Sequence, residues 1–414
     1  MQVYKFGGAS IKDAEAVKNV ANIIKLFGKK PLVVVVSAMG KTTRALEDLL
    51  LHKNDKSFET RWSAIKEFHF NLMKGLFPTD HPVFKEINSR FTELVRLDYK
   101  HSDNTLIHAQ VVSFGEIFSS VIVTNYLQLL EIDSHWLYAP EVIHTTKKFS
   151  EGEIEWTITE QAILDHLTPI LSDKIVVTQG YIASCSEGVI TLGKEGSDYT
   201  AAIFGASLHA NKVTIWKDVP GILNADPKEI KDAKQFYDLS YTEASEMTYY
   251  GASVIHPKTI KPLATRKIPL IVRSFDNPES APTIIGDKAL KGLEPSIIYK
   301  RNQCLFSFKV TDFTFVNEKN LAAIFKALHD LNLPINMMQN SAISISVCFT
   351  YNKPKVDKLL STLSATFEMY YNTGLKLITI KNYTPFALSE YTPPKSNIMM
   401  EQRTRNNYRA LIKE

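Results

Sequence analysis

The first 280 residues alternate short apolar runs with stretches of helical periodicity. Residues 3–6 form a strand-like run, and apolar positions at helical spacing follow from Ala14 to Ile24. The next run, 32–36, consists of leucine and valine, which is typical of a strand buried on both faces of a parallel sheet. A second helical stretch follows it. The pattern predicts a β–α–β unit at the N-terminus.

Helical periodicity dominates the segment from about residue 55 to residue 130. Pro78 and Pro82 mark a break, and the motif SFGE at 113–116 is expected to interrupt the last part. An alanine-rich helical stretch lies at 199–208. Strand-like runs occur at 175–181, 189–192, 213–217 and 270–273. The alternation predicts an α/β fold with a mainly parallel open sheet sandwiched by helices.

A different pattern begins beyond Asn277-Pro278. Strand-like and helical segments alternate at 305–310, 321–331, 343–349, 356–367 and 375–380. A turn-rich connector, 392–397, precedes one last short stretch. We therefore expect a larger domain over 1–280, a linker over 281–300 and a smaller α+β domain over 301–414.

Composition narrows the class of protein. A hydrophobic fraction of 44%, a charged fraction of 22% and a net charge of +4 are ordinary for a soluble globular protein, and the interspersed charges predict no nucleic-acid partner. The three cysteines have neither metal-type spacing nor the even number of a disulfide framework, so we expect no metal centre and a reducing compartment. No apolar run approaches the ~20 residues of a membrane span. These features predict a cytoplasmic protein.

A lysine and two glycines stand where the first strand meets its turn. In KFGGAS (5–10), Lys5 would end the strand, and Gly7, Gly8 and Ser10 would form the turn and the helix cap. Backbone amides at a helix start, beside a mobile positive charge, favour a polyphosphate site. The alternative is an ordinary strand-to-helix turn with a surface lysine.

A second loop of this kind is GKEGSD (193–198). It lies between a predicted strand and a predicted helix, so it is expected at the sheet edge where ligands bind in open α/β folds. Asp198 could hold a lysine or magnesium in place there. Alternatively, Ser197 or Asp198 only caps the helix.

Three further segments are less specific. The turn that contains Lys217, Asp218 and Gly221 could wrap a nucleotide base or ribose, or be a solvated turn. The carboxylate of Glu116 in SFGE would suit a substrate ammonium, or is simply exposed. His256, which precedes a proline, is interpreted as a packed turn residue without a chemical role.

Six segments in order carry a family resemblance: KFGGAS, VVVVSAMGKTT, SFGE, TLGKEGSDYTAA, WKDVPGILNADP and YYGASVIHPKTI. Together they resemble the aspartate kinase family of the amino-acid kinase superfamily. The resemblance implies transfer of the γ-phosphoryl group of MgATP to the β-carboxylate of L-aspartate, giving 4-phospho-L-aspartate and ADP. This is the first step towards lysine, threonine and methionine. An ionised carboxylate needs no general base, so the reaction depends on alignment and charge neutralisation.

The resemblance implies roles for the two glycine loops. Lys5 would neutralise the transferring phosphoryl group, and Asp198 would organise that lysine or the metal. Gly7, Gly8 and Ser10 would bind the ATP phosphates. The nucleotide would also be surrounded by Lys217, Asp218, Gly221, Leu223 and Lys228, of which the last two replace a tyrosine and an arginine found in some members.

The same resemblance implies an aspartate pocket. Glu116 would pair with the substrate ammonium. The rest of the pocket would be formed by Ser37, Thr43, Phe149, Lys194 and Ser197. Lys194 stands where the family usually has arginine in GRGGSD, so a point charge would replace a bidentate grip on the α-carboxylate. Glu195 stands where glycine is common and adds a negative charge near the phosphates.

The smaller domain resembles the ACT regulatory domain of these kinases. That domain is a βαββαβ unit that pairs with another copy and binds amino-acid effectors between the copies. The length after residue 300 accommodates one such unit, whereas many relatives carry two. The resemblance implies feedback control by lysine or threonine and a homodimer.

Two other readings compete with an aspartate kinase. One is another superfamily enzyme, acting on N-acetylglutamate, glutamate, carbamate or UMP. SFGE and the ACT-like segment argue against it, because a UMP kinase needs no carboxylate for a substrate ammonium and the other three generally lack such a tail. The second is a catalytically silent amino-acid sensor. The pair Lys5 and Asp198 argues against this, since a silent protein could dispense with it.

Overall fold

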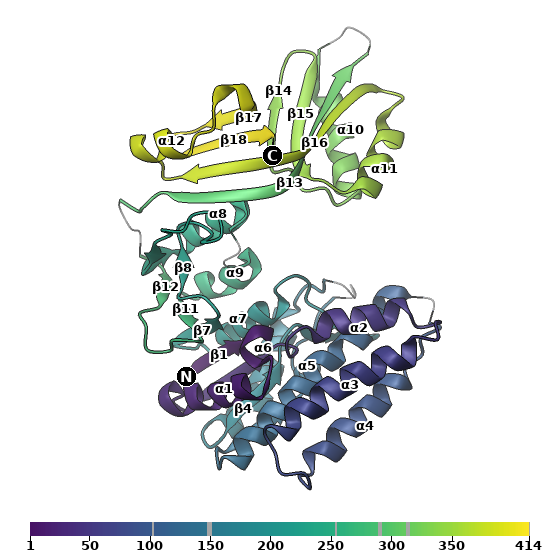
Figure 1. The fold of residues 1–414 in the computed structure, drawn as a ribbon, viewed down its shortest axis with the longest axis vertical. Helices are drawn as coiled ribbons and strands as arrows, with labels where there is room; N and C mark the ends of the chain where they lie inside the picture. The colour runs from purple at the N-terminus through teal and green to yellow at the C-terminus, as the bar shows by residue number, and fades with distance from the viewer. Residues whose placement is uncertain (102, 147–150, 253–254, 289–291, 312–314, 414) are drawn as a thin grey trace. The chain divides into compact units, whose positions relative to one another are not determined.

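The chain forms two compact units. The computed structural model describes all residues except 102, 147–150, 253–254, 289–291, 312–314 and 414 (Figure 1). The first unit comprises Met1–Ile222, Gln235–Ser245 and Val254–Leu290, and the second comprises Leu223–Lys234, Glu246–Ser253 and Lys291–Glu414. The expected domain bounds at 280 and 300 stay a prediction. The span expected to be a linker contains strand β12 (Thr283–Gly286) and the start of strand β13 (Ser296–Val310).

The first unit is an α/β structure. Its strands are β1 (Gln2–Phe6), β2 (Leu32–Val36), β3 (Ser134–Leu137), β4 (Ile175–Gln179), β5 (Ile182–Cys185), β6 (Gly188–Thr191), β7 (Lys212–Lys217), β9 (Gln235–Phe236), β10 (Asp238–Ser240), β11 (Leu270–Ser274) and β12. Its helices are α1 (Ala14–Phe27), α2 (Thr42–Leu51), α3 (Phe58–Lys74), α4 (Val83–Val95), α5 (Asn104–Leu129), α6 (Trp156–Leu171), α7 (Gly196–Ser207) and α9 (Pro257–Thr265). The residues of β8 (Ile222–Leu223) and α8 (Tyr241–Tyr250) are divided between the two units.

An eight-stranded sheet forms the centre of the first unit, in the order β10-β12-β11-β7-β1-β2-β4-β3. Every neighbouring pair is parallel except β11 and β12, which confirms the predicted mainly parallel sheet. Phe6, the last residue of β1, stands opposite Val36 of β2 and Trp216 of β7. The carboxyl ends of these strands therefore meet at one edge of the sheet.

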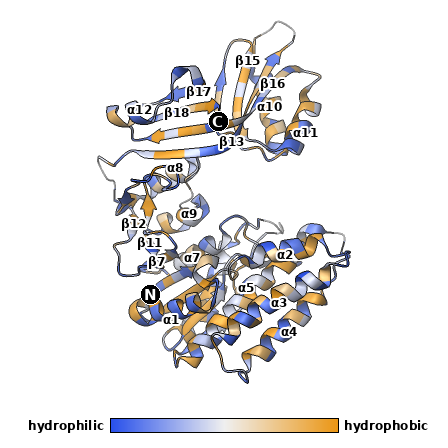
Figure 2. Cartoon of the chain, viewed as in Figure 1, coloured by the Kyte–Doolittle hydropathy of each residue, from blue (hydrophilic) through white to orange (hydrophobic). Residues whose placement is uncertain are grey.

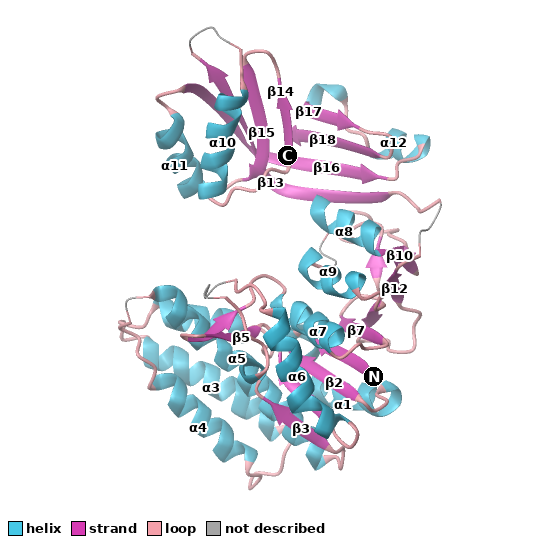
Figure 3. Cartoon of the chain, turned by 180° about the vertical axis from the view of Figure 1, so that it is seen from behind, coloured by secondary structure: helices cyan, strands magenta, loops and turns pink. Residues whose placement is uncertain are grey.

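Helices cover the sheet because its central strands are apolar on both faces. All five residues of β2 and of β4 are buried. Helix α7 packs on β1, β2 and β7, and α5 packs on β2, β3 and β4, with α2 and α4 against α5 (Figure 3). The outer helices are amphipathic: the buried residues of α4 are Val83, Ile87, Phe91 and Leu94. Orange and blue accordingly alternate along α3 and α4 in Figure 2.

Helix α5 runs without a break through SFGE, so the predicted interruption there is wrong. A Cβ on Gly115 would lie 3.0 Å from the Cβ of Ala38 and 3.3 Å from the side chains of Leu46 and Thr42. The glycine thus allows close packing of α5 and does not end the helix.

Among the described residues α5 is the one helix long and apolar enough to cross a membrane, but 89% of its most apolar window is buried in the fold, as in a core helix.

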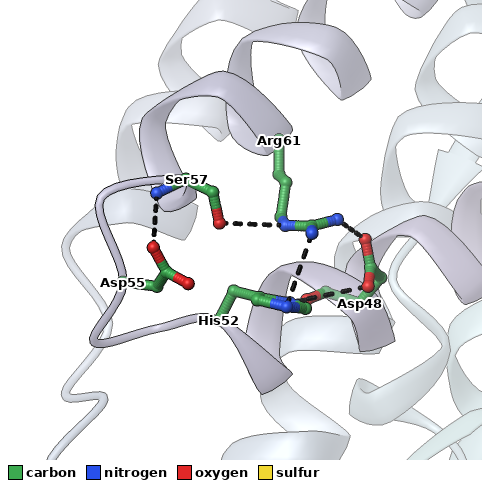
Figure 4. A network of polar contacts seen from close by, with 5 residues as sticks. All are labelled: Asp48, His52, Asp55, Ser57 and Arg61. Carbon is green, nitrogen blue, oxygen red and sulfur yellow. Dashed lines mark hydrogen bonds and ion pairs between the residues drawn. The ribbon is translucent and has the colours of Figure 1, made fainter.

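A polar network joins α2 to the start of α3 (Figure 4). Asp48 forms an ion pair with Arg61, and the Nδ1 of His52 lies 2.8 Å from the backbone oxygen of Asp48. The Nε of Arg61 donates to the Oγ of Ser57 at 3.3 Å, and the Ser57 N–H donates to Asp55 at 3.0 Å. The side chains of Asp48 and Arg61 are 44% and 32% exposed, so this network remains in contact with solvent.

The second unit is built on a six-stranded antiparallel sheet in the order β14-β15-β13-β16-β18-β17. After β13 follow α10 (Glu318–Asp330), β14 (Met337–Asn340), β15 (Ser344–Thr350), α11 (Lys353–Leu363), β16 (Phe367–Lys381), α12 (Pro385–Tyr391), β17 (Ile398–Arg403) and β18 (Asn407–Lys413). Residues of α10 and α11 share one core with β13, β15 and β16 (Figure 3). From β13 to β16 this is the expected βαββαβ order. The last stretch adds two strands to the same sheet.

Candidate active site

The strand ends and the loops that follow them enclose a cavity of about 530 Å³ in the first unit. Nine of the residues predicted from the sequence line it: Lys5, Gly8, Ser37, Thr43, Glu116, Lys194, Ser197, Asp198 and Lys217. They come from the ends of β1, β2 and β7 and the turns that follow β1 and β2, from α2 and α5, and from the loop before α7 and its first turn. The parallel order of β1, β2 and β7 alone brings Lys5, Ser37 and Lys217 to one edge of the sheet.

Four predicted residues of the first unit do not line this cavity. Gly7 and Ser10 belong to the turn after β1, and Asp218 and Gly221 to the loop after β7. Phe149 lies outside the described residues. Leu223 and Lys228 belong to the second unit, so their places are described within that unit only.

Asp198 is the centre of a buried cluster of charges. Its carboxylate lies 2.6 Å from the Nζ of Lys5 and 3.6 Å from the Nζ of Lys217, and its side chain is 4% exposed. Burial alone would raise the pKa of Asp198, but the two lysines outweigh it and hold the pKa below its usual range. Asp198 is therefore ionised at neutral pH. Its carboxylate serves the ion cluster, whereas the N-cap position of α7 belongs to Glu195.

Glu116 is buried in the same cavity, contrary to the alternative that it is simply exposed. Only 3% of the residue is accessible, and its Oε2 has no hydrogen-bond partner among the described residues. Burial raises the pKa of Glu116 to about 8, although a backbone hydrogen bond from Ala38 and the charge of Lys5 act in the opposite direction. A buried carboxylate with one unpaired oxygen favours a cationic ligand.

The turn after β1 differs from the prediction that Ser10 caps a helix. Residues 8–11 form a short 3₁₀ turn, and α1 begins at Ala14. Its N-cap is Asp13, whose carboxylate accepts from the N–H of Ala16 at 2.8 Å. Asp13 has the extended backbone that capping requires. Gly8 still allows a close approach, because a Cβ there would lie 2.7 Å from the carbonyl oxygen of Ala38.

The loop before α7 reaches towards α9. Glu195 accepts a 2.9 Å hydrogen bond from the backbone N–H of His256 through its Oε2. The Nδ1 of His256 accepts from the N–H of Lys258 at 3.2 Å and caps α9, which is the packed-turn role expected for this histidine.

Six lining residues were not predicted as site residues: Ala38, Gly40, Tyr181, Gly193, Glu195 and Gly196. Five of them lie inside motifs that carried the family resemblance. Tyr181 has no such signal, and its φ of 68° places a bulky residue in the left-handed region. Among the described residues, no three His, Cys, Asp or Glu side chains converge in a way that could hold a metal ion.

Comparisons with known proteins agree with this geometry. Residues 1–274 match the model of the Amino acid kinase family. "Lysine-sensitive aspartokinase 3" of Escherichia coli K12 is 28% identical over 391 residues, which cover 91% of this chain and 86% of that protein. Bifunctional aspartokinase/homoserine dehydrogenases of plants also match, and this chain spans 42% of their length.

Solved structures extend the likeness to the whole chain. Aspartokinase III of E. coli in complex with aspartate and ADP (R-state) has a TM-score of 0.84 and 26% identity, covering 100% of this chain and 96% of that one. The same protein in complex with lysine and aspartate (T-state) has a TM-score of 0.82 over the same coverage.

Proposed function

The chain belongs to the amino acid kinase family, and on this premise we propose that it is an aspartate kinase. It transfers the γ-phosphoryl group of ATP to the β-carboxylate of L-aspartate and releases 4-phospho-L-aspartate and ADP. One observation carries the proposal: a buried carboxylate with an unpaired oxygen, Glu116, shares a cavity with the cluster of Lys5, Asp198 and Lys217. The cavity thus offers a cation site beside a phosphate site.

The charged cluster would stabilise the transferring phosphoryl group. Two ammonium groups and one carboxylate leave a net positive charge, which suits the phosphate oxygens. Lys5 is the proposed contact to the transferring group, and Asp198 holds its ammonium in place. The backbone amides of Gly7 and Gly8, with Ser10 behind them, are proposed to bind the phosphates. The β-carboxylate of aspartate is ionised at neutral pH, so transfer needs no general base.

The other side of the cavity would hold the amino acid. Glu116 pairs with the substrate ammonium, and the ionised form of Glu116 is favoured once that cation is bound. Lys194 contacts the α-carboxylate as a point charge. The hydroxyls of Ser37, Thr43 and Ser197 complete the pocket. Phe149 is retained as a proposed pocket residue from the resemblance.

The proposal also covers the nucleotide and its metal ion. The ADP complex of the E. coli relative supports nucleotide use here, with Lys217, Asp218, Gly221, Leu223 and Lys228 as the proposed surroundings. The described residues provide no cluster for a protein-bound metal, and Asp198 already faces two lysines. We therefore propose that Mg²⁺ is held through the ATP phosphates and water, as is usual for this ion.

The second unit is proposed to regulate the kinase. The lysine complex of the E. coli relative supports an amino-acid effector. Lysine or threonine is the proposed effector, and this sheet is its proposed binding place. A homodimer formed through the second unit and a cytoplasmic location are parts of the same proposal.

The proposal is tested by ADP release with MgATP and L-aspartate, with the acyl phosphate trapped as a hydroxamate. Glutamate, N-acetylglutamate, carbamate and UMP serve as rival acceptors, and Lys5→Ala as the inactive control. We expect turnover with aspartate alone and its loss in the control. Turnover with another acceptor would identify a different kinase of the family, and inertness with every acceptor would favour an amino-acid sensor.

A further inference from the structure

Glu195 occupies a strained position in the loop before α7. Its backbone has φ 55° and ψ 30°, in the left-handed region that glycine adopts at little cost. Gly193, two residues earlier, also has a positive φ, of 75°. Glu195 needs a compensating interaction, since the left-handed conformation itself disfavours any residue with a side chain.

The compensating interaction is a hydrogen bond to another element. The Oε2 of Glu195 accepts from the His256 N–H at 2.9 Å, and His256 is the N-cap residue of α9. A carboxylate at the N-terminus of a helix is also favoured by the helix dipole. Glu195 thus ties the loop to α9 across 61 residues of sequence.

A second carboxylate, Glu151, lies between the same loop and α9. Lys258, in the first turn of α9, forms an ion pair with Glu151. The side chain of Glu151 lies beside Gly193, where a Cβ would be 3.2 Å from its Cγ. The residues on either side of Lys194 in the sequence thus both have a contact with another part of the fold, and Lys194 itself lines the cavity.

We infer that Glu195 is a positioning residue that fixes the loop so that Lys194 meets the substrate carboxylate. The inference rests on the proposed function. An arginine can orient itself on a carboxylate through two parallel hydrogen bonds, but a lysine is a point charge on a flexible stem. The backbone that carries Lys194 must therefore set where its charge lies, and the Glu195 tether sets that backbone. The carboxylate of Glu195 acts on the loop and contacts no reacting atom.

Three variants separate this role from a structural one. Glu195→Gly removes the tether and the backbone strain together, Glu195→Ala removes the tether alone, and Glu195→Gln keeps a neutral acceptor. We expect the KM for L-aspartate to rise five- to tenfold in the Gly and Ala variants, with kcat changed less than twofold. The Gln variant should restore the KM to within about threefold of wild type. Glu160→Gln, which weakens an ion pair with Arg266 at the other end of α9, is the matched control with an unchanged KM.

The glycine variant decides the question, because it relieves strain and should fold at least as well as the alanine variant. An unchanged KM in Glu195→Gly would overturn the inference. Hydrogen exchange of a peptide that includes the His256 amide provides a readout independent of turnover: exchange should accelerate in Glu195→Gly and Glu195→Ala. If wild-type protein phosphorylates no acceptor, the proposed function fails, and equal His256 exchange in wild type and variants would separately refute the tether.

Discussion

The first unit contains two clusters in which acidic and basic side chains pair, and the two clusters differ in burial. In the cavity, Asp198 is 4% exposed between Lys5 and Lys217, and Glu116 nearby keeps an unpaired oxygen. Between α2 and α3, Asp48 pairs with Arg61 in a half-exposed network (Figure 4). The second cluster has water as an alternative partner for each group.

The difference in burial supports the proposal that the cavity cluster, and not the α2–α3 network, binds a ligand. Burying charge is costly unless the charges are paired, and an unpaired buried oxygen adds to the cost. Glu116 carries this cost, because its Oε2 is buried without a partner among the described residues, and this supports its proposed role as a ligand contact. The α2–α3 network has no such cost, and its contribution is confined to the contact between two helices.

The largest expected effect comes from removing the lysine of the buried cluster. In Lys5→Met the transferring phosphoryl group would lose its proposed ammonium contact, and kcat should fall about a thousandfold. Asp198 retains Lys217 as a partner, so the variant should fold. The measurement is the rate of ADP release at saturating ATP and aspartate. A loss of less than tenfold would remove Lys5 from the transfer step.

Helix α3 carries both Arg61 of the exposed network and a fully buried histidine, His69. The two residues compare the effect of burial within one helix. His69 is fully buried, its Nε2 has no partner among the described residues, and burial lowers its pKa to about 4. The folded-state pKa is below the unfolded value of 6.5, so stability is highest above pH 6.5 and falls as the pH drops towards 4. The loss should reach about 3 kcal/mol.

Urea unfolding at several pH values measures this effect. The slope of unfolding free energy against pH between 6.5 and 4 should decrease in His69→Phe relative to wild type. Equal slopes in the two proteins would show that His69 does not carry the acid sensitivity.

Glu116 predicts a pH dependence of the opposite sign. Its pKa is raised to about 8 from 4.5, so the ligand-free protein loses stability as pH rises from 4.5 towards 8, and Glu116→Gln should remove that loss. Binding of the substrate ammonium requires the ionised form. The kcat/KM for aspartate should therefore rise up to about pH 8 in wild type and stay flat in the variant, which should be ten- to a hundredfold weaker at high pH. A rising profile in both proteins would assign the titration to another group.

The smallest effect is expected at the exposed network. Arg61→Ala breaks the pair with Asp48, but exposed ion pairs contribute roughly 1 kcal/mol or less. Activity should remain within twofold of wild type, and the free energy of unfolding should change by that small amount. A loss comparable to that of Lys5→Met would mean that the α2–α3 contact supports the cavity.

The sequence allowed most of the kinase fold to be predicted because its central strands are continuous apolar runs, such as Leu32–Val36. It failed at SFGE, where Gly115 serves helix packing, a contact invisible to local pattern. The long strands β13 and β16 were predicted only in part, since polar residues near Asn302 and Asn372 interrupt their apolar runs. The last two strands were not predicted, because the continuous apolar run in each is only three residues long, 398–400 and 410–412.

Some residues of the site could be predicted from the sequence, and others could not. Lys5, Glu116 and Asp198 were found because each lies in a motif of the family. Tyr181 could not be predicted. It lies in the cavity with a left-handed backbone conformation, which its residue type does not indicate. The role of Glu195 depends on His256, a partner far along the chain, so only the structure reveals it.

The proposed function depends on Glu116 as the partner of the substrate ammonium. The most direct test compares L-aspartate with succinate, which lacks the ammonium, as phosphoryl acceptors of wild type and Glu116→Gln at pH 8.5. We expect wild type to prefer aspartate by at least tenfold in kcat/KM and the variant to lose most of that preference. An undiminished preference in Glu116→Gln would contradict the proposed role of Glu116, because the ammonium would then be recognised elsewhere.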